Sequence, residues 1–458
     1  MFAHYRKRIS VLRELNQKLG TMNSSQCKKR ILIDSCDMHP VTVARYMVLI
    51  RKGIREGYSP VMYYHGLLTT IAIWGFGSIK QYFIDQVARS FAYKGCEKVK
   101  STKLGITEFL KLIFMPSRER GLQDFEDLIL DGIFRAEGVP DLSYLKKRTV
   151  SKHYLVALKM IESAVDLVNE ADLVVVGHRT YYFRGILYRI AGIQNKGYYI
   201  GPRLNNFYIK RLTNRNYRMS IQRTDNEADF LPTGLILPKE ENQWLKDVRK
   251  SFVNVDFKKF ETKVPLLCFH VWTDDNFKGE YNLFENHYQA SIQISKKLSE
   301  SRVPFYYKFH PQTNKYGLKK YIDIVEKHIE DYGGFGVNVS EVRNNLLFPL
   351  TSVVVTGNGT VGTEAAASNV PVLCYSDAHY YVKGHWSFPG DKGEFYTKLL
   401  SSMDGQVLCG PFKEFLKSSK LPYEETVDFS HLVAKPVLGV DLDKYDINAV
   451  WVNSIFEV

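Results

Sequence analysis

The sequence has no apolar run long enough to cross a membrane as a helix, which takes about 20 residues. Its longest apolar stretch, residues 67–76, falls far short of this length and contains Gly75 near its end. The first eight residues are basic, but a polar stretch follows them at 13–18, with no apolar core and no small-residue cleavage site. We therefore expect no membrane-spanning helix and no export, and a cytoplasmic protein that is free or bound to a membrane surface.

Closely spaced cysteine pairs are also missing. The chain has six cysteines and no C-x-x-C motif, and Cys268 and Cys374 fall inside apolar, strand-like runs. The spacing excludes the common zinc-binding patterns and predicts reduced, mostly buried thiols, as in the cytoplasm. The other four are Cys27, Cys36, Cys96 and Cys409.

Acidic residues are outnumbered, because 62 Lys and Arg stand against 49 Asp and Glu. The resulting charge of +13 and pI near 9.2 favour anionic partners such as nucleotide phosphates, lipid head groups or nucleic acid. The basic residues are spread along the chain, with no zinc finger, RNP-like aromatic motif or basic stripe, so we expect no nucleic-acid partner. Anionic lipids at a membrane surface explain the charge more simply.

The 458 residues exceed one ordinary core, and apolar runs alternate with helical patterns in both halves. This alternation predicts parallel sheets covered by helices on both faces. Strands are expected at 29–34, 60–64, 173–176, 197–200, 264–269, 305–308, 352–355 and 370–375, and helices at 39–56, 155–170, 183–191, 281–299 and 318–332.

The pattern loses its period between Arg211 and Lys263, where prolines and charged stretches accumulate. We therefore predict an N-terminal domain at 1–230, a linker at 231–262, a C-terminal domain at 263–410, and a final segment, 411–458, that packs back on the N-terminal domain.

A glycine-rich turn at 357–362 follows an apolar strand and leads into a short helix. Backbone N–H groups at such a junction suit an anion. Gly357, Gly359 and Gly362 fit the dinucleotide pattern G-x-G-x-x-G, with Asp377 near the distance of a ribose-binding acid. However, Asn369 and Pro371 end the helix after about two turns, and only about 100 residues follow, so an NAD-dependent enzyme is the weaker interpretation.

Two further motifs follow predicted strands of the C-terminal half. In Lys308-Phe309-His310-Pro311, proline keeps the preceding residue extended, which presents Lys308 and His310 at the carboxyl end of the sheet. After the strand that ends near Phe269 come His270, Asp274 and Asp275. These three are candidates for the reacting centre, since a carboxylate there can deprotonate an acceptor or attack an anomeric carbon, whereas an ordinary helix-capping Asp is the competing interpretation.

The glycine-rich segment resembles the donor-site signature of GT-B glycosyltransferases, through Gly359, Thr360, Gly362, Glu364, Ala365, Ala366 and Pro371-Val372. Lys-x-His-Pro resembles the capsule-polysaccharide, Kdo-transferase and polysialyltransferase members. The resemblance implies that Gly359, Thr360 and Gly362 hold phosphate, that Glu364 holds the ribose, and that Lys308 and His310 also contact the donor.

The N-terminal half has two stretches that resemble the same group, at 131–135 and 176–185. Because GT-B enzymes bind the acceptor in this half, the resemblance implies that His178, Tyr181 and Tyr182 contact it. Plain packing of aromatic side chains is the competing interpretation.

The resemblance implies a GT-B α/β fold, with two Rossmann-like domains whose parallel sheets face an interdomain cleft. It further implies a metal-independent glycosyltransferase, without a cofactor, that moves a sugar from a nucleotide-activated donor to a lipid-linked glycan of a bacterial capsule or O-antigen, at the inner face of the cytoplasmic membrane. The D-x-D at Asp441–Asp443 lies in a polar tail and reads as surface. The alternatives are a CDP-polyol phosphotransferase and a UDP-sugar 2-epimerase.

Overall fold

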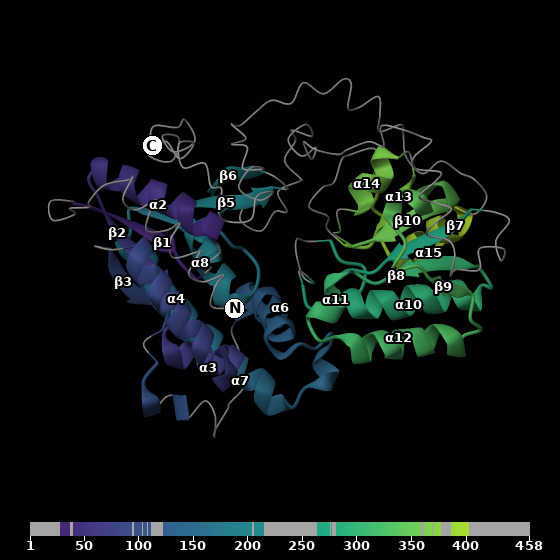
Figure 1. Ribbon diagram of the computed structural model, residues 1–458, viewed down its shortest axis with the longest axis horizontal. Helices are drawn as coiled ribbons and strands as arrows, with labels where there is room; N and C mark the ends of the chain where they lie inside the picture. The colour runs from purple at the N-terminus through teal and green to yellow at the C-terminus, as the bar shows by residue number, and fades with distance from the viewer. Residues whose placement is uncertain are drawn as a thin grey trace. The chain divides into compact units, whose positions relative to one another are not determined.

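The computed structural model describes residues 28–36, 40–93, 96–102, 104–107, 109–110, 122–203, 206–214, 263–274, 276, 281–357, 359, 361–368, 370–376 and 386–402 (Figure 1). These residues form two compact units. The first contains the described residues up to Glu137 and from Lys146 to 214; the second contains Gly138–Leu145 and the described residues from 263 onward. The predicted linker and the final segment lie outside the described residues, so those boundaries stay predictions.

The first unit is built on a six-stranded sheet of order β3-β2-β1-β4-β5-β6. Its strands pair in parallel, except that β5 and β6 are antiparallel. Its elements are β1 (Lys29–Asp34), α2 (Pro40–Arg55), β2 (Tyr58–Tyr64), α3 (Leu67–Trp74), η1 (Phe76–Ser78), α4 (Ile79–Ala92), β3 (Glu97–Lys100), η2 (Gln123–Phe125), α6 (Glu126–Glu137), α7 (Lys147–Glu170), β4 (Leu173–Val176), α8 (Tyr182–Ile193), β5 (Gly197–Arg203) and β6 (Asn206–Leu212).

The second unit has a six-stranded sheet of order β12-β11-β10-β7-β8-β9, parallel throughout. Its elements are η3 (Leu142–Tyr144), β7 (Val264–Cys268), α10 (His287–Glu300), β8 (Phe305–Lys308), α11 (Gln312–Lys315), α12 (Lys319–Asp331), β9 (Gly336–Asn338), α13 (Asn344–Leu347), η7 (Phe348–Leu350), β10 (Thr351–Thr356), α14 (Val361–Ala367), β11 (Val372–Cys374), β12 (Trp386–Ser387) and α15 (Lys392–Ser401).

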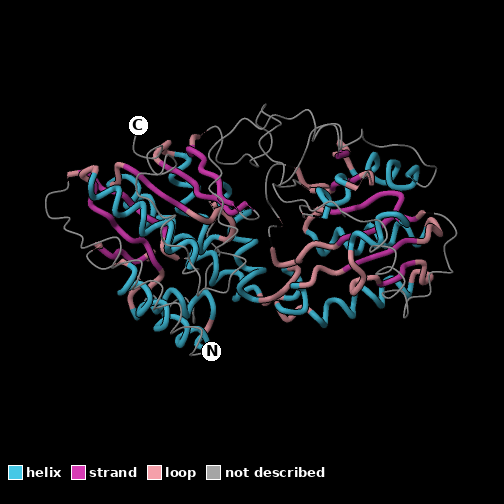
Figure 2. The backbone as a smooth tube through the Cα atoms, turned by 45° about the horizontal axis from the view of Figure 1, so that its top comes forward, coloured by secondary structure: helices cyan, strands magenta, loops and turns pink. Residues whose placement is uncertain are grey.

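Both sheets follow one winding rule. In each unit the first three strands extend the sheet in one direction, and the fourth strand pairs with the first and starts the other half. This is the doubly wound Rossmann order, in which helices cover both faces. Figure 2 shows the strands of each unit lying between helices. The predicted α/β fold with two Rossmann-like domains is confirmed, while the predicted cleft between them stays a prediction.

The central strands form because their residues are apolar on both faces. All four residues of β4 and all five of β7 are buried. In the second unit, β7 and β10 pack with α13 and α14 in one cluster that includes Leu266, Val354 and Ala365. These strands are therefore fixed by burial, and their carboxyl ends are held at defined positions at one edge of each sheet.

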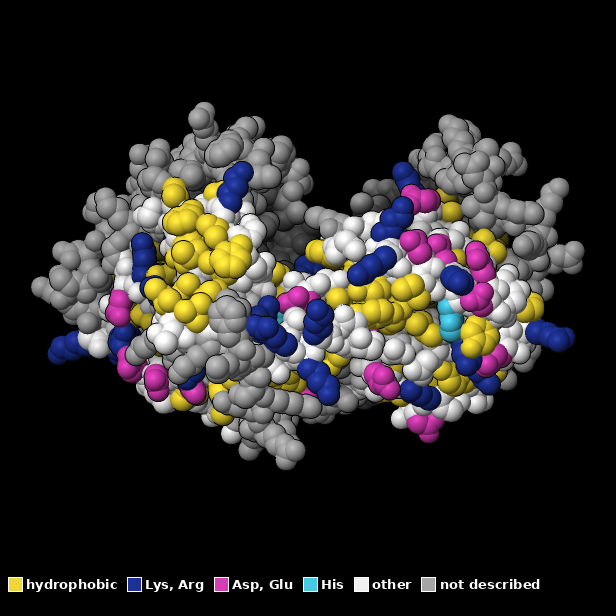
Figure 3. All heavy atoms as spheres, turned by 90° about the horizontal axis from the view of Figure 1, so that it is seen from below, with side chains coloured by type: hydrophobic (Ala, Val, Ile, Leu, Met, Phe, Trp, Pro, Cys, Tyr) yellow, Lys and Arg dark blue, Asp and Glu magenta, His cyan; other side chains and the backbone are white. Residues whose placement is uncertain are grey.

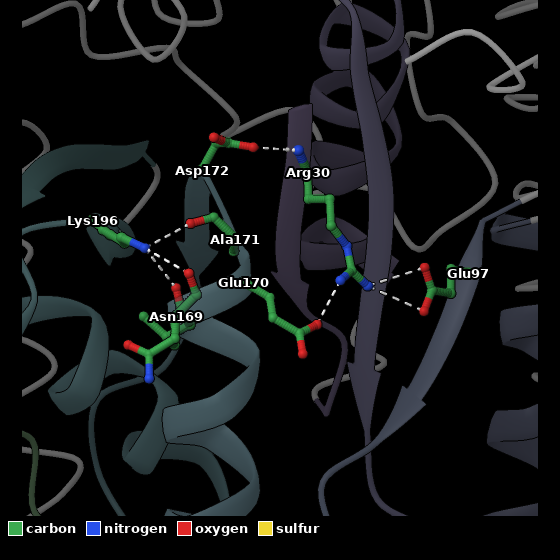
Figure 4. A network of polar contacts seen from close by, with 8 residues as sticks. Arg30, Glu97, Asn169, Glu170, Ala171, Asp172 and Lys196 are labelled. Atoms are coloured by element: carbon green, nitrogen blue, oxygen red, sulfur yellow. Dashed lines mark hydrogen bonds and ion pairs between the residues drawn. The ribbon is translucent and has the colours of Figure 1, made fainter. Parts of the chain in front are cut away.

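Polar contacts close the amino edge of the first sheet (Figure 4). Arg30 of β1 donates to Glu170 at 2.6 Å and to Glu97 at 3.2 Å, while its backbone N–H donates to Asp172 at 2.7 Å. Lys196 donates to the carbonyls of Asn169 and Ala171 at 3.0 Å and so caps the end of α7. The polar groups at this edge are hydrogen-bonded to one another. A ligand site is therefore expected at the carboxyl edge of the sheet.

One predicted helix begins later than expected. The pattern predicted a helix at 281–299, but α10 begins at His287. The side chain of Asn286 accepts a hydrogen bond from the Gln289 N–H at 2.8 Å and so caps the helix. His287 consequently lies in the first turn and not in the helix interior, and this places it beside the loop that follows β7.

Candidate functional site

The candidate site of the second unit lies where its sheet changes winding direction. β7 pairs with β10, and the chain extends the sheet through β8 on one side and through β11 on the other. Loops that follow two such strands separate, and ligands of doubly wound folds bind in the space above them. The loop after β7 carries His270, and the turn after β10 carries Gly357 and Gly359.

Three histidines lie close together at this edge. The ring centroids of His270 and His287 are 4.7 Å apart, and those of His270 and His310 are 6.1 Å apart. They come from the loop after β7, the first turn of α10 and the end of β8. The structure therefore joins two residues that were predicted, His270 and His310, with one that was not, His287.

The loop after β7 is fixed to α10 by buried polar contacts. Trp272 is buried, and its indole N–H donates to the Ser291 hydroxyl at 3.0 Å. The Asn276 amide donates to the Trp272 carbonyl and accepts from the His287 N–H, both at 2.9 Å. Because a buried polar group is costly to leave unpaired, these bonds hold His270 and His287 in a defined arrangement.

His310 is set up to donate a hydrogen bond. Its Nδ1 accepts the backbone N–H of Gln312 at 3.2 Å, so the proton of the neutral ring is on Nε2. Burial lowers the pKa of His310 below 6.5, and the charge of Asp274 opposes this shift. At neutral pH the ring is therefore uncharged, with Nε2–H as a donor.

An asparagine bridges the two predicted charged ligands of the donor. The Lys308 ammonium donates to Asn344 Oδ1 at 2.8 Å, and Asn344 Nδ2 donates to Glu364 Oε2 at 2.9 Å. Lys308 also donates to the Val342 carbonyl. Burial lowers the pKa of Lys308, while the nearby carboxylate of Glu364 opposes this. Lys308 and Glu364 thus belong to one network, which also lies near Cys268, whose pKa burial raises to about 12.

Side chains packed around Gly357 leave no room for a Cβ atom at this position. A Cβ at this position would lie 2.8 Å from His287 Cε1 and 2.9 Å from Ser376 Oγ. Ser376 is buried, and its hydroxyl has no hydrogen-bond partner among the described residues. A buried hydroxyl of this kind costs free energy unless a ligand or water satisfies it, and Ser376 lies beside Gly357 and His287 at this edge.

The remaining donor residues are placed as follows. Gly359 follows β10, and the Gly362 N–H donates to the Gly359 carbonyl at 3.1 Å, so Gly362 closes the turn in this structure. The helix α14 that follows has seven residues, in agreement with the short helix that was predicted. Thr360 and Asp275 lie outside the described residues. Asp274 is half-buried and close enough to His310 to influence its pKa.

Sequence reasoning missed His287, Asn344 and Ser376. His287 was hidden because the helix was predicted to begin earlier. Asn344 lies in a polar stretch before β10, and Ser376 follows β11; neither belongs to a recognisable pattern. Capping by Asn286 is the one local signal that could have placed His287 at a helix start.

The predicted acceptor residues of the first unit differ in exposure, because His178 is half-buried whereas Tyr181 and Tyr182 are buried. His178 is half-buried in the loop after β4, where its Nδ1 accepts the Thr180 N–H at 3.3 Å. Tyr181 has φ of 62°, a strained backbone for a residue other than glycine, and stacks on Phe183. Tyr182 is fully buried, and its hydroxyl bonds to His153 Nδ1 at 2.7 Å. Tyr182 is therefore placed as a packing residue, away from solvent.

The carboxyl edge of the first sheet carries a polar cluster that the sequence did not reveal. Asp34 ends β1, and its Oδ1 accepts the Cys36 N–H at 2.9 Å. The guanidinium of Arg89 is buried and donates to the Ser35 carbonyl from Nη2 at 2.9 Å and from Nε at 3.2 Å. β1 and β4 are the strands at which this sheet changes direction, so the cluster occupies the same topological position as the site in the second unit.

His65 joins this cluster from the end of β2. Its Nδ1 lies 2.8 Å from the Ser101 hydroxyl and 3.9 Å from Cys36 Sγ. Burial, together with the charge of Arg89, lowers the pKa of His65 to about 3, so the ring is neutral at physiological pH. The pKa of the Cys36 thiol is raised by burial and by Asp34, which leaves it protonated and a poor nucleophile.

Within the part of the chain that the structure describes, no three His, Cys, Asp or Glu side chains are grouped so as to hold a metal ion. The same described residues include no helix with the length and apolarity needed to span a bilayer.

No known family model matches the chain, and no curated protein does either. Among solved structures, a glycosyltransferase from Rickettsia africae matches with 10% identity and a TM-score of 0.32, covering 94% of this chain and 99% of its own. HepE of Anabaena with UDP and glucose matches with 11% identity and a TM-score of 0.30, over 93% and 98%. MurG of Acinetobacter baumannii matches with 10% identity and a TM-score of 0.27, over 94% and 100%. At these scores the fold assignment rests on the strand orders above.

Proposed function

We propose that the protein is a glycosyltransferase that binds a nucleotide-activated sugar at the carboxyl edge of its second unit. The observation that carries this proposal is the convergence of Lys308, His310, His270 and Glu364 at the switch point of a Rossmann-like sheet. Doubly wound sheets bind nucleotides at this position. The resemblance of Lys308–Pro311 and of the glycine turn to GT-B donor motifs supports the same interpretation.

The chemistry of glycosyl transfer fits these side chains. An acceptor hydroxyl gives its proton to a base, for which Asp274 is the candidate, and its oxygen bonds to the anomeric carbon. The bond from that carbon to the nucleotide phosphate breaks, so negative charge develops on the departing oxygen. The Nε2–H of His310 and the ammonium of Lys308 are hydrogen-bond donors for that oxygen. Glu364 accepts hydrogen bonds only, which suits the hydroxyls of a ribose.

The acceptor is assigned to the first unit. His65 and His178 are half-buried at the ends of β2 and β4, while Ser101 and Asp34 are buried and fix the edge around them. Such a set binds the hydroxyls of a glycan. We propose further that the acceptor is a lipid-linked glycan of a bacterial capsule or O-antigen, that transfer needs no metal, and that the enzyme works at the inner membrane surface; the Lys-x-His-Pro resemblance and the basic charge support these assignments.

The test is a thermal-shift titration of the full-length protein with CMP, CDP, UDP, GDP and dTDP, each with and without its sugar. A ligand that binds only the native state raises the melting temperature according to its affinity and concentration. We expect one class of nucleotide to raise the melting temperature of the protein. His310→Ala and Glu364→Ala should each weaken binding of that nucleotide by about 10- to 150-fold, because a lost hydrogen bond to a charged group is worth about 1.5–3 kcal/mol.

The matched control is Gln293→Ala, which removes an amide that accepts from Lys392 at 3.1 Å on α10, outside the candidate site. It should leave nucleotide affinity unchanged. A shift with NAD alone would reject the donor site. Hydrolysis or epimerisation of the sugar without an acceptor would favour a 2-epimerase, and release of CMP from a CDP-polyol would favour the phosphotransferase.

A further inference from the structure

Part of the first unit's surface is apolar where water-facing residues are usually polar. Phe76 is 68% exposed, Phe83 is 56% exposed and Ile106 is 71% exposed. Trp74, Val87 and Leu110 are also exposed. Figure 3 shows a broad apolar area on this unit. An exposed apolar area of several large side chains indicates a surface that binds a protein, a membrane or another ligand when the protein functions.

The helix α4 shows why this area is unusual. Its outward side carries Phe83 and Val87, one turn apart, whereas Arg89 points inward and donates to the Ser35 carbonyl. The water-facing side of a surface helix is normally polar. The exposed side of α4 is instead mixed, because Phe83 and Val87 lie among the exposed Lys80, Gln81 and Ser90.

The apolar side chains gather near one edge of the sheet. α3 begins after β2 ends, and Trp74 at its end packs on Phe183 of α8 at 4.8 Å between ring centroids. Ile106 and Leu110 follow β3, whose end is joined to that of β2 by the Ser101 N–H at 2.7 Å from the Tyr64 carbonyl. This is the carboxyl edge that also carries His65 and Asp34.

Basic side chains accompany the apolar area. Lys80 on α4 and Lys100 at the end of β3 are exposed. Lys146, Lys147 and Arg148 are exposed at the start of α7, which lies toward the same edge because α7 runs back to the amino end of β4. Figure 3 shows Lys and Arg side chains at the margin of the apolar area. Among the described residues of 66–110 the acids are Asp85 and Glu97, and Glu97 pairs with Arg30 at the opposite edge.

We propose that this face, formed by α3, η1, α4 and the start of α7, docks on the surface of a bilayer that contains anionic lipids. Exposed Trp and Phe side chains enter the interfacial region of a bilayer, and neighbouring Lys and Arg bind anionic head groups. The inference deepens the proposed function, since a lipid-linked acceptor is presented at such a surface. The face lies next to His65 and Asp34, so docking brings the polar cluster to the level of the head groups.

The test is sedimentation of the full-length protein with two kinds of vesicle, one of phosphatidylcholine alone and one that also contains about 30% phosphatidylglycerol. The anionic lipid gives the second kind a negative surface potential. We expect binding to the anionic vesicles that weakens with salt. The variant with Phe76→Ser and Phe83→Ser should bind at least about tenfold more weakly. The variant with Lys146→Gln, Lys147→Gln and Arg148→Gln should lose about 100-fold on anionic vesicles, with little change on neutral ones.

Matched controls come from α12 of the second unit and the residue after it, where Ile324 and Tyr332 are exposed apolar side chains and Lys319 and Lys320 are exposed cations. Ile324→Ser with Tyr332→Ser, and Lys319→Gln with Lys320→Gln, should keep vesicle binding. Equal loss in the control variants, or no vesicle binding by the unaltered protein, would overturn the proposal. So would self-association, detected by light scattering, that disappears with Phe76→Ser and Phe83→Ser while vesicles have no effect.

The nucleotide titration separates this inference from the proposed function. The docking variants alter the first unit only, so they should bind nucleotide at the second unit as the unaltered protein does, and an unchanged urea unfolding curve shows that their first unit is folded. Vesicle binding without any nucleotide binding would reject the glycosyltransferase and keep the docking face; nucleotide binding without vesicle binding would do the reverse.

Discussion

His153 is a buried histidine that connects two polar side chains of the first unit. Its Nε2 lies 2.7 Å from Glu137 Oε1, and its Nδ1 lies 2.7 Å from the Tyr182 hydroxyl. A carboxylate only accepts, so Nε2 carries the proton and Nδ1 accepts from the tyrosine. The order of donors, from tyrosine to histidine to glutamate, is therefore fixed by chemistry, and it holds α6, α7 and α8 together.

This chain of bonds predicts that acid destabilises the first unit. The hydrogen bond from His153 lowers the pKa of Glu137 from 4.5 to about 2, so the stability it contributes is present above pH 4.5 and is lost as the pH falls toward about 2. Burial lowers the pKa of His153 below 6.5, so below pH 6.5 protons bind preferentially to the unfolded chain. Both groups lower the free energy of unfolding as the pH falls. The contribution of His153 is lost first, because it begins to be lost below pH 6.5.

The variant His153→Gln checks the histidine contribution, because glutamine can donate to Glu137 and accept from Tyr182 without titrating. Urea unfolding at pH 7, 6 and 5 should show a pH slope that is smaller by up to about 1.4 kcal/mol per pH unit, the limit for one proton. Tyr182→Phe keeps the titrating ring and should keep the slope. An unchanged slope in His153→Gln would show that other groups cause the acid sensitivity.

At the scale of single residues, the sequence identified those site residues that follow a strand directly. Lys308 ends β8, His310 follows it, and His270 follows β7, so their positions at the edge of the sheet come from the apolar strand before them. Asn344, His287 and Ser376 could not be found in this way, because they reach the site from other elements through the tertiary fold. Tyr182 also comes after a strand, but its side chain packs in the core, against Gly132 of α6, where any larger residue would clash with the tyrosine ring.

At the scale of elements, the contact between α6 and α8 depends on Gly132. A Cβ at this position would lie 2.3 Å from Cδ1 of Tyr182, far inside the distance at which two carbons can pack. Gly132→Ala should therefore force the tyrosine ring or the helix to move and reduce the free energy of unfolding by about 1–3 kcal/mol, as is usual for overpacked cores. Urea denaturation of the full-length protein measures this effect.

The control for helix packing is Gly77→Ala in η1, where an added Cβ would meet nothing within 4 Å. It should change the free energy of unfolding by less than about 0.5 kcal/mol. If Gly132→Ala also changed the free energy of unfolding by less than about 0.5 kcal/mol, α6 and α8 would not pack as closely as described. In a Tyr182→Leu background the loss caused by Gly132→Ala should be smaller, because the smaller side chain leaves room for the methyl group.

Elements with one strong periodic signal were predicted well, and those without one were missed. The strands at 29–34, 173–176 and 305–308 have the bounds that were expected from their apolar residues. The strand β3, with sequence Glu-Lys-Val-Lys, gave no such signal, because it is an edge strand whose residues are exposed or half-buried. α4 was missed because the exposed Phe83 and Val87 and the buried Arg89 blur its helical pattern.

At the scale of the whole molecule, the two units repeat one topology, and each has a polar cluster at the same place in it. In the first unit Asp34, His65 and Arg89 lie at the carboxyl ends of β1 and β2, and in the second His270 and His310 lie at those of β7 and β8. The amino edge of the first sheet is instead closed by ion pairs and caps (Figure 4). A ligand is therefore expected at a carboxyl edge in either unit.

Hydrogen exchange measured by mass spectrometry, with and without the nucleotide found in the titration, tests this division. Backbone amides that a ligand covers or rigidifies exchange more slowly. With nucleotide we expect slower exchange at 269–274, 309–313 and 341–346, by at least about tenfold where binding is saturated, since ligand binding lowers the population of open states in proportion to its occupancy. Amides at 29–31 and 168–172, at the amino edge of the first sheet, should exchange at their original rate.

The outcome separates the donor edge from the acceptor edge. Protection by nucleotide at 34–36 and 100–102, without any at 309–313, would move the donor to the first unit and reverse the two assignments. Protection at 269–274, 309–313 and 341–346, with none at 34–36 or 100–102, supports the donor site of the second unit, where hydrogen bonds join Lys308, Asn344 and Glu364 although they lie far apart in the sequence. Adding an oligosaccharide acceptor should then slow exchange at 34–36 and 100–102, since the proposed acceptor groups belong to a different sheet edge.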